Sequence, residues 1–92
     1  MKIYQSRIFE KAVTKLSKPG KLVLDEEIKK IVNNPFLGNK KKGDLSKVFV
    51  HKFKVETAQY LVAYRVYEEV LELIMIGPHE NYYRDLKNYL DK

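Results

Sequence analysis

The sequence contains no cysteine and no tryptophan, and only four glycines and three prolines among its 92 residues. Without cysteine there can be no disulfide framework, no thiolate nucleophile and no cysteine-ligated zinc site. The glycines, at positions 20, 38, 43 and 77, are too scattered for a Gly-x-x-x-x-Gly-Lys or Gly-x-Gly-x-x-Gly phosphate-binding loop. The two histidines, His51 and His79, lie 28 positions apart without further ligands nearby, so we expect neither a metal site nor a bound cofactor.

Long hydrophobic runs are missing as well. Apolar stretches such as Leu73 to Ile76 are far shorter than the ~20 residues that a bilayer-spanning helix needs. Four charged side chains interrupt the first thirteen residues, which is unlike the apolar segment of a secretory signal. We therefore expect a cytoplasmic protein that does not associate with membranes.

The composition is that of one small folded domain spanning residues 1–92. Hydrophobic residues make up 45% of the chain and aromatic residues 12%, more than a disordered polar chain carries. A domain of this size buries roughly 60–65% of the surface that its unfolded chain exposes. The sequence therefore predicts a single modest core.

Positive charge is concentrated in one segment. The chain carries a net charge of +6, and residues Lys40 to Lys54 hold six lysines against the single acid Asp44, a net charge of +5. Such a segment produces a positive field suited to phosphate or to an acidic partner. The alternative, a solvated lysine loop that only maintains solubility, remains open from charge alone.

Hydrophobic spacing predicts a strand and then two helices in the first third of the chain. Residues 3–5 suit a short strand, and apolar residues at helical spacing indicate a helix over about 6–17 that ends at Pro19-Gly20. A second helix is predicted from Lys21, with the acids 25–27 early in it, and ends before Pro35. A four-residue break between the helices implies an antiparallel helical hairpin.

The spacing of apolar residues then changes to the period of two that is typical of strands. Within residues 48–55 the alternation places Lys52 and Lys54 together on one strand face, opposite His51, which we expect to be buried. Two further strands, 60–67 and 70–76, are joined by a tight turn at Glu68-Glu69, and a terminal helix follows that Asn81 can cap. The predicted fold class is α+β, with the order β-α-α-β-β-β-α and a helical hairpin packed on a mostly antiparallel sheet.

The segment after the last strand has the densest set of chemically active side chains. Residues 77–86 read Gly-Pro-His-Glu-Asn-Tyr-Tyr-Arg-Asp-Leu, so an imidazole, phenols and a guanidinium lie at one boundary between elements. Histidine exchanges protons near neutral pH, and tyrosine can stack on a base. The alternative is a plain strand-to-helix turn in which His79 binds a backbone carbonyl and the tyrosines fill the core.

The element order, the strand with Lys52 and Lys54, the run Tyr60-Leu61-Val62-Ala63-Tyr64 and the closing segment from Gly77 to Tyr83 together resemble the RelE/ParE superfamily of bacterial toxins. The resemblance spans almost the whole chain. It implies either a ribosome-dependent nuclease that cleaves messenger RNA, as in RelE-like members, or a DNA gyrase inhibitor, as in ParE-like members. Fold alone does not choose between these activities.

Several residues match the nuclease members individually. The resemblance assigns phosphate stabilisation to Lys52 and Lys54, acid or base catalysis to His79, and stacking on the target base to Tyr83, with Tyr82 as a one-residue alternative. It also implies an arginine early in the third strand, where this chain has Tyr60-Leu61 instead. A second proton-transfer residue is left open between Glu80, His51 and a lysine.

The leading hypothesis is therefore a metal-free, cofactor-free mRNA endonuclease toxin of a type II toxin–antitoxin system. Its partners would be the ribosome, mRNA and a cognate antitoxin with an acidic, amphipathic segment. The gyrase inhibitor and an inactive basic nucleic-acid-binding member of the fold are the alternatives. Beyond the four catalytic candidates, the expected RNA-binding residues are Lys40, Lys41, Lys42, Lys47, Arg65, Tyr82 and Arg84.

Overall fold

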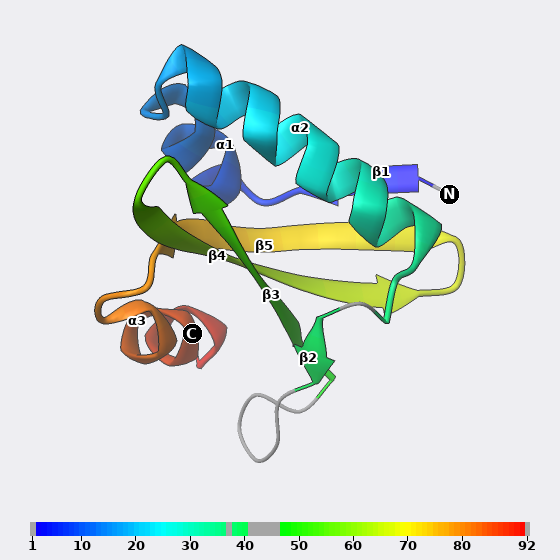
Figure 1. The fold of residues 1–92 in the computed structure, drawn as a ribbon. Helices are drawn as coiled ribbons and strands as arrows, with labels where there is room; N and C mark the ends of the chain where they lie inside the picture. The colour runs from blue at the N-terminus through cyan, green and yellow to red at the C-terminus, as the bar shows by residue number, and fades with distance from the viewer. Residues whose placement is uncertain (1, 37, 41–46, 92) are drawn as a thin grey trace.

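The computed structural model describes residues 2–36, 38–40 and 47–91 and has one five-stranded mixed sheet at its centre (Figure 1). The strands in chain order are β1 (Lys2–Gln5), β2 (Asn39–Lys40), β3 (Phe49–Val55), β4 (Ala58–Tyr67) and β5 (Val70–Pro78). They are arranged β1-β5-β4-β3-β2, with β1 parallel to β5 and every other pair antiparallel. The predicted fold class and order are confirmed. The two-residue β2 was not predicted, because it is too short to show a period.

The helical hairpin consists of α1 (Arg7–Thr14) and α2 (Lys18–Asn33). Both helices begin at a serine cap: the hydroxyl oxygen of Ser6 accepts from the Phe9 N–H, and that of Ser17 accepts from the Gly20 N–H, both at 3.1 Å. Our expectation of a break at Pro19-Gly20 was wrong, since Pro19 lies in the first turn of α2. Proline is favourable there because its missing N–H would have no helical partner.

The corrected start of α2 also moves its acidic residues. The first turn of α2 contains no acid, so Asp25, Glu26 and Glu27 lie in the middle of the helix instead of near its positive end. The contribution of these acids to the stability of α2 therefore depends on neighbouring side chains and not on the helix dipole.

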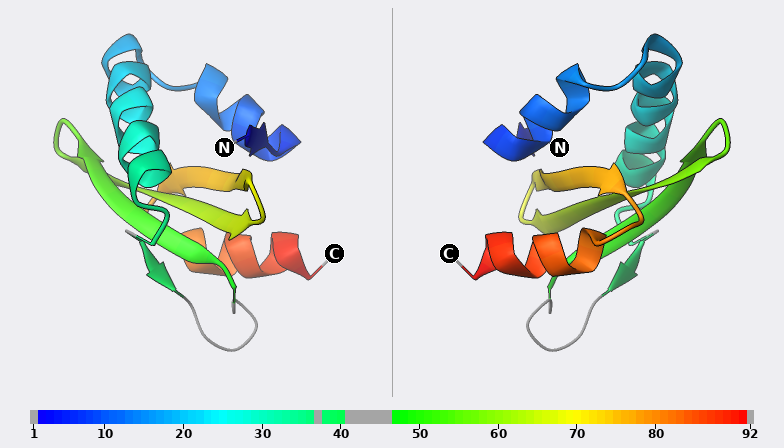
Figure 2. Two further views of the ribbon diagram at one scale, coloured as in Figure 1. Left: turned by 90° about the vertical axis from the view of Figure 1, so that its right-hand side faces the viewer. Right: turned by 90° about the vertical axis from the view of Figure 1, so that its left-hand side faces the viewer.

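Each face of the sheet is covered by different helices (Figure 2). The hairpin packs on one face, where the core includes Phe9, Ile31, Val62 and Tyr64. Helix α3 (Tyr82–Leu90) packs on the other face, where the core consists of Val48, Val50, Leu61, Ala63, Ile74, Tyr82 and Leu86. Alternate residues of one strand therefore enter different cores, which is what a period of two requires when both faces are covered.

The pairing of β4 with β5 is interrupted by a bulge. Ala63 pairs with Met75, but the next residue, Tyr64, pairs with Leu73, so that Ile74 is an extra residue on β5. Ile74 and Met75 both pack towards α3. A bulge of this kind shifts the alternation of one strand relative to its neighbour.

Helix α3 begins at an unusual residue. Asn81 occupies the N-cap position with φ of 60°, in the left-handed region, and its side chain makes no capping hydrogen bond. Asn81 therefore turns the chain between β5 and α3 but does not cap the helix in the way we expected. In the described ranges of the chain, no helix is long and apolar enough to cross a membrane.

Candidate active site

Lys54, Gln59 and His79 form a row across three adjacent segments of the sheet. Lys54 on β3 pairs with Gln59 on β4, and the His79 N–H donates to the Gln59 carbonyl oxygen at 3.1 Å. Paired residues of neighbouring strands lie on the same face, about 4.8 Å apart, so the Cα atoms of Lys54 and His79 are about 10 Å apart. All three residues are exposed. We refer to them as the Lys54–Gln59–His79 row.

A second row runs parallel to the first, one step closer to α3. Lys52 pairs with Leu61, and Leu61 pairs with Gly77. Leu61 is fully buried, and a Cβ atom on Gly77 would lie 3.5 Å from the ring of Tyr82. The Tyr82 ring therefore covers the Gly77 end of this row, while Lys52 remains exposed beside Lys54. The two lysines share one strand face, as the alternation predicts.

Tyr83 lies in the first turn of α3, next to the imidazole. The ring centroids of His79 and Tyr83 are 6.4 Å apart at an interplanar angle of 85°, an edge-to-face contact. The start of α3 therefore brings Tyr83 to the His79 end of the row. Tyr83 is only partly buried.

Tyr82 does not have the environment of an RNA-binding residue. It is 1% exposed, and its hydroxyl donates to the Met75 carbonyl oxygen at 2.6 Å. Burial raises the pKa of its phenol strongly, despite a backbone hydrogen bond from Ala63 that acts in the opposite direction. Our assignment of Tyr82 as an alternative stacking residue was wrong, because a ring in the core cannot contact a nucleotide.

The other cations expected at the site lie elsewhere or outside the described residues. Arg65 lies at the opposite end of β4, with its Nε 3.2 Å from Glu72 Oε1. The structure therefore gives no support for Arg65 as a replacement for the arginine that was expected at Tyr60-Leu61. Lys47 is exposed just before β3 begins, and Arg84 is exposed and lies near Asp85 at 3.4 Å. The backbone of Lys40 belongs to β2, and Lys41 and Lys42 lie outside the described residues.

His51 points away from the row, into the interface between β3 and α2. Its Nε2 lies 2.6 Å from Glu27 Oε1, and each side chain is exposed by 12% or less. Burial by itself would raise the pKa of Glu27, but the hydrogen bonds and charges of His51 and Lys30 outweigh it and hold that pKa below its ordinary value. As a carboxylate only accepts, the imidazole must carry its proton on Nε2. His51 is thus unable to reach a substrate on the row, which leaves Glu80 and the lysines as candidates.

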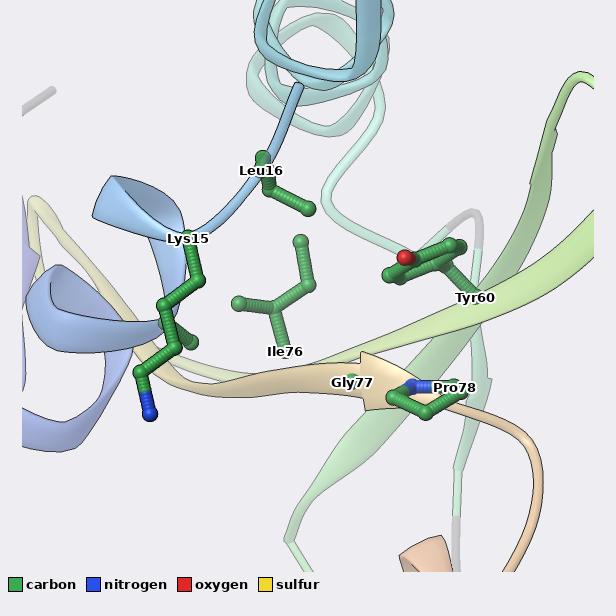
Figure 3. A pocket seen from close by; sticks show the side chains of 7 residues that line it. Lys15, Leu16, Tyr60, Ile76, Gly77 and Pro78 are labelled. Atoms are coloured by element: carbon green, nitrogen blue, oxygen red, sulfur yellow. The ribbon is translucent and has the colours of Figure 1, made fainter.

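An apolar cleft of about 170 Å³ opens on the other side of the same strand ends. In Figure 3, Leu16 and Ile76 point towards each other, the Tyr60 ring closes one side, and the ammonium group of Lys15 points away. Tyr60 and Ile76 belong to the core beneath the helical hairpin. The cleft therefore lies behind the row, on the hairpin side of the sheet, away from the lysines and the imidazole of the row.

Two contributors to this arrangement were missed by sequence reasoning. Gln59 was not singled out, and only the pairing of Lys54 with Gln59 and of Gln59 with His79 reveals its position. Glu27 was interpreted only as one of three acids early in the second helix, although it falls on the helical stripe of Leu24 and Ile31, which are both buried. That spacing was a signal that Glu27 faces the sheet.

Taken together, the exposed groups at this end of the sheet can bind an anion, exchange a proton and stack an aromatic ring. The lysines supply positive charge, His79 supplies an imidazole that can accept or donate a proton, and Tyr83 supplies the ring. These are the requirements of phosphodiester chemistry without a metal.

Comparison with solved structures finds this fold in bacterial toxins. The chain is 20% identical to a chain of the intact E. coli RelBE toxin–antitoxin complex, with a TM-score of 0.69 over 86% of this chain and 96% of that one. It is 19% identical to the YoeB/ParE toxin from Agrobacterium tumefaciens, with a TM-score of 0.71 over 86% and 99%. For the isolated E. coli RelE toxin the values are 19%, 0.66, 96% and 97%.

Comparison with curated protein sequences gives no significant match. A family model does match, over residues 3–87, and it describes ParE-like toxins of type II bacterial toxin–antitoxin systems. The match covers nearly the whole sheet, helices α1 and α2, and the first two thirds of α3. The chain therefore belongs to the ParE-like toxin family of type II toxin–antitoxin systems.

Proposed function

We propose that this toxin is a ribosome-dependent endonuclease that cleaves messenger RNA without a metal ion. The observation that carries the proposal is the Lys54–Gln59–His79 row, with Lys52 beside it and the Tyr83 ring in contact with His79. The lysines and the ring would also serve a toxin that only binds its target, so the exposed imidazole beside them is the group that favours catalysis.

The reaction needs three kinds of group. A base removes the proton from the ribose 2′-OH, the oxygen then attacks the neighbouring phosphate, and an acid protonates the departing 5′-oxygen. Lys52 and Lys54 stabilise the charge that develops on the phosphate, His79 transfers one of the two protons, and Tyr83 stacks on the target base. Glu80, exposed and directly after His79, is the leading candidate for the second proton transfer.

The test of the phosphate role compares two double variants of equal charge. Lys52→Ala with Lys54→Ala, and the control Lys21→Ala with Lys29→Ala on the exposed surface of α2, each lower the net charge from +6 to +4. We expect the first pair to lose about 10²–10³-fold or more in the rate of cleavage of ribosome-bound mRNA, and the control to keep it. Equal rates for the two folded double variants would refute the phosphate role.

A second candidate function is inhibition of DNA gyrase without nuclease chemistry. It is favoured by the absence, among the described residues of this site, of an arginine early in β4: Leu61 is buried there, and Arg65 lies further along the strand and faces Glu72. Parallel labelling of protein and DNA synthesis in the first minutes after induction separates the two functions. Early loss of protein synthesis supports the nuclease, and early loss of DNA synthesis supports gyrase inhibition.

We also propose that a cognate antitoxin with an acidic segment holds the toxin inactive. The fold is shared with a chain of the RelBE toxin–antitoxin complex, and a net charge of +6 favours an acidic partner. Co-expression of a small acidic protein encoded next to the toxin gene should restore growth. If no small acidic protein encoded next to the toxin gene restores growth, the proposal of an acidic antitoxin is contradicted.

A further inference from the structure

Gln59 has a position that the proposed mechanism leaves unused. It is the middle residue of the row, paired with Lys54 on one side, and its carbonyl oxygen accepts from the His79 N–H on the other. Its neighbours Ala58 and Tyr60 point to the hairpin side, where Tyr60 stacks on Phe53. The Gln59 side chain therefore stands on the same face as the lysine and the imidazole, between them.

The chemistry of a carboxamide suits this position. Glutamine offers two N–H donors and one acceptor and carries no charge, so it can bind an anion without changing the charge of its neighbours. Gln59 is exposed, and no hydrogen bond of its side chain is found within the described residues. Its N–H groups are therefore available to a ligand.

A substrate that reaches both ends of the row must pass over Gln59. The Cα atoms of Lys54 and His79 are about 10 Å apart, and both side chains approach the same phosphodiester if His79 transfers a proton while Lys54 stabilises charge. The reacting phosphate then lies above the middle residue. Leu61, the middle residue of the next row, is fully buried and offers no polar group.

We propose that Gln59 is a substrate-binding residue whose amide N–H donates to a non-bridging oxygen of the scissile phosphate. This inference rests on the proposed nuclease function and assigns to Gln59 a neutral donor role beside the two lysines. The group is placed by the pairing of Gln59 with Lys54 and by the hydrogen bond that its carbonyl oxygen accepts from the His79 N–H.

Substitution of Gln59 tests the role through the rate. Gln59→Met keeps the length of the side chain and removes both donors, and we expect kcat for cleavage of ribosome-bound mRNA to fall about 10- to 100-fold. That range lies between the loss of an ordinary neutral hydrogen bond and the loss of a fully enclosed oxyanion donor, since Gln59 is exposed. Gln59→Glu should be slower still, because its carboxylate repels the phosphate.

The matched control is Gln5→Met, which changes the other glutamine of the chain, exposed on the edge strand β1. It should cleave like the unmodified protein. Thermal melting confirms that all three variants fold. If Gln59→Met and Gln59→Glu, both folded, cleave as fast as Gln5→Met, the assignment is overturned.

Phosphorothioate substrates give a readout that a structural role would not move. Sulfur accepts hydrogen bonds poorly, so replacement of the contacted oxygen in one of the two diastereomers should slow the unmodified protein. The slowing should disappear in Gln59→Met, which has no donor left to lose. If the ratio of the cleavage rates of the oxygen and sulfur substrates is the same in Gln59→Met as in the unmodified protein, the proposed contact is overturned. The nuclease proposal would still stand in that case. If the unmodified protein cleaves no ribosome-bound mRNA, the nuclease proposal itself fails, and this inference fails with it.

Discussion

The hydrogen bond between His51 and the Glu27 carboxylate provides the sharpest test of the energetics of this fold. Glu27→Gln keeps the size of the side chain and removes its charge. The carboxylate contacts His51 Nε2 at 2.6 Å and Lys30 Nζ at 2.9 Å, with 11% of the Glu27 side chain exposed. The substitution therefore replaces a largely buried, charge-assisted hydrogen bond by a neutral one.

The expected loss follows from these two contacts. A hydrogen bond to a charged group contributes about 1.5–3 kcal/mol and a neutral one about 0.5–1.5 kcal/mol, so the change at His51 costs about 1–1.5 kcal/mol. Lys30 is 61% exposed, and its pair adds about 0.5 kcal/mol. We expect a loss of about 2 kcal/mol in the free energy of unfolding, or roughly 8–16 °C in Tm for a domain of this size.

The loss must also depend on pH in one direction. The pKa of Glu27 is lower in the folded protein than its ordinary value of 4.5, so the charged carboxylate stabilises the fold above that value. This contribution is lost as the pH falls through the lowered pKa. The difference between the unmodified protein and Glu27→Gln should therefore be full at pH 7 and disappear in acid.

Urea unfolding at pH 7 and at several acidic pH values measures both effects. Glu26→Gln is the matched control, because Glu26 is the neighbouring acid, is 69% exposed and pairs with Lys29 only at 3.4 Å. It should cost less than about 0.5 kcal/mol. The reasoning is refuted if the two variants lose the same stability at pH 7, or if the loss in Glu27→Gln is as large in acid.

Three further predictions concern α3, the β4–β5 turn and the site. Tyr82→Phe leaves the partly buried Met75 carbonyl oxygen without its 2.6 Å partner and should cost about 1–3 kcal/mol in urea unfolding; an unchanged midpoint would contradict the contact. Glu68 has φ of 51°, a conformation that asparagine tolerates better, so Glu68→Asn should raise Tm by a few degrees, and a lower Tm would argue against strain there. Tyr83→Phe should keep more mRNA cleavage than Tyr83→Ala because stacking needs the ring; the reverse order would indicate proton transfer by the phenol.

The sequence was sufficient to predict the parts of the fold that depend on local spacing. Alternation in β3 placed Lys52 and Lys54 on one face, and the stripe of Tyr82 and Leu86 indicated α3. The same stripe put Tyr82 in the core, so the choice between Tyr82 and Tyr83 as the stacking residue was already available from the spacing.

What the sequence could not supply depends on contacts between distant segments. The parallel pairing of β1 with β5 and the partner of Glu27 both join residues that local patterns do not relate. The start of α2 was misplaced because a proline followed by glycine was read as a stop, although Ser17 before it is a good cap. The position of Gln59 needed the register of β3 with β4 and of β4 with the end of β5.

The bulge at Ile74 determines which side of the protein His79 faces. If β4 and β5 paired without the extra residue, continuing from the Tyr64–Leu73 pair, Gln59 would lie opposite Pro78, and His79 would move to the opposite face of the sheet. The imidazole would then point towards the helical hairpin, away from both lysines. The acid–base group and the phosphate-binding groups therefore share a face because β5 carries one residue more than β4 at this point, which is remote from every group that contacts a substrate.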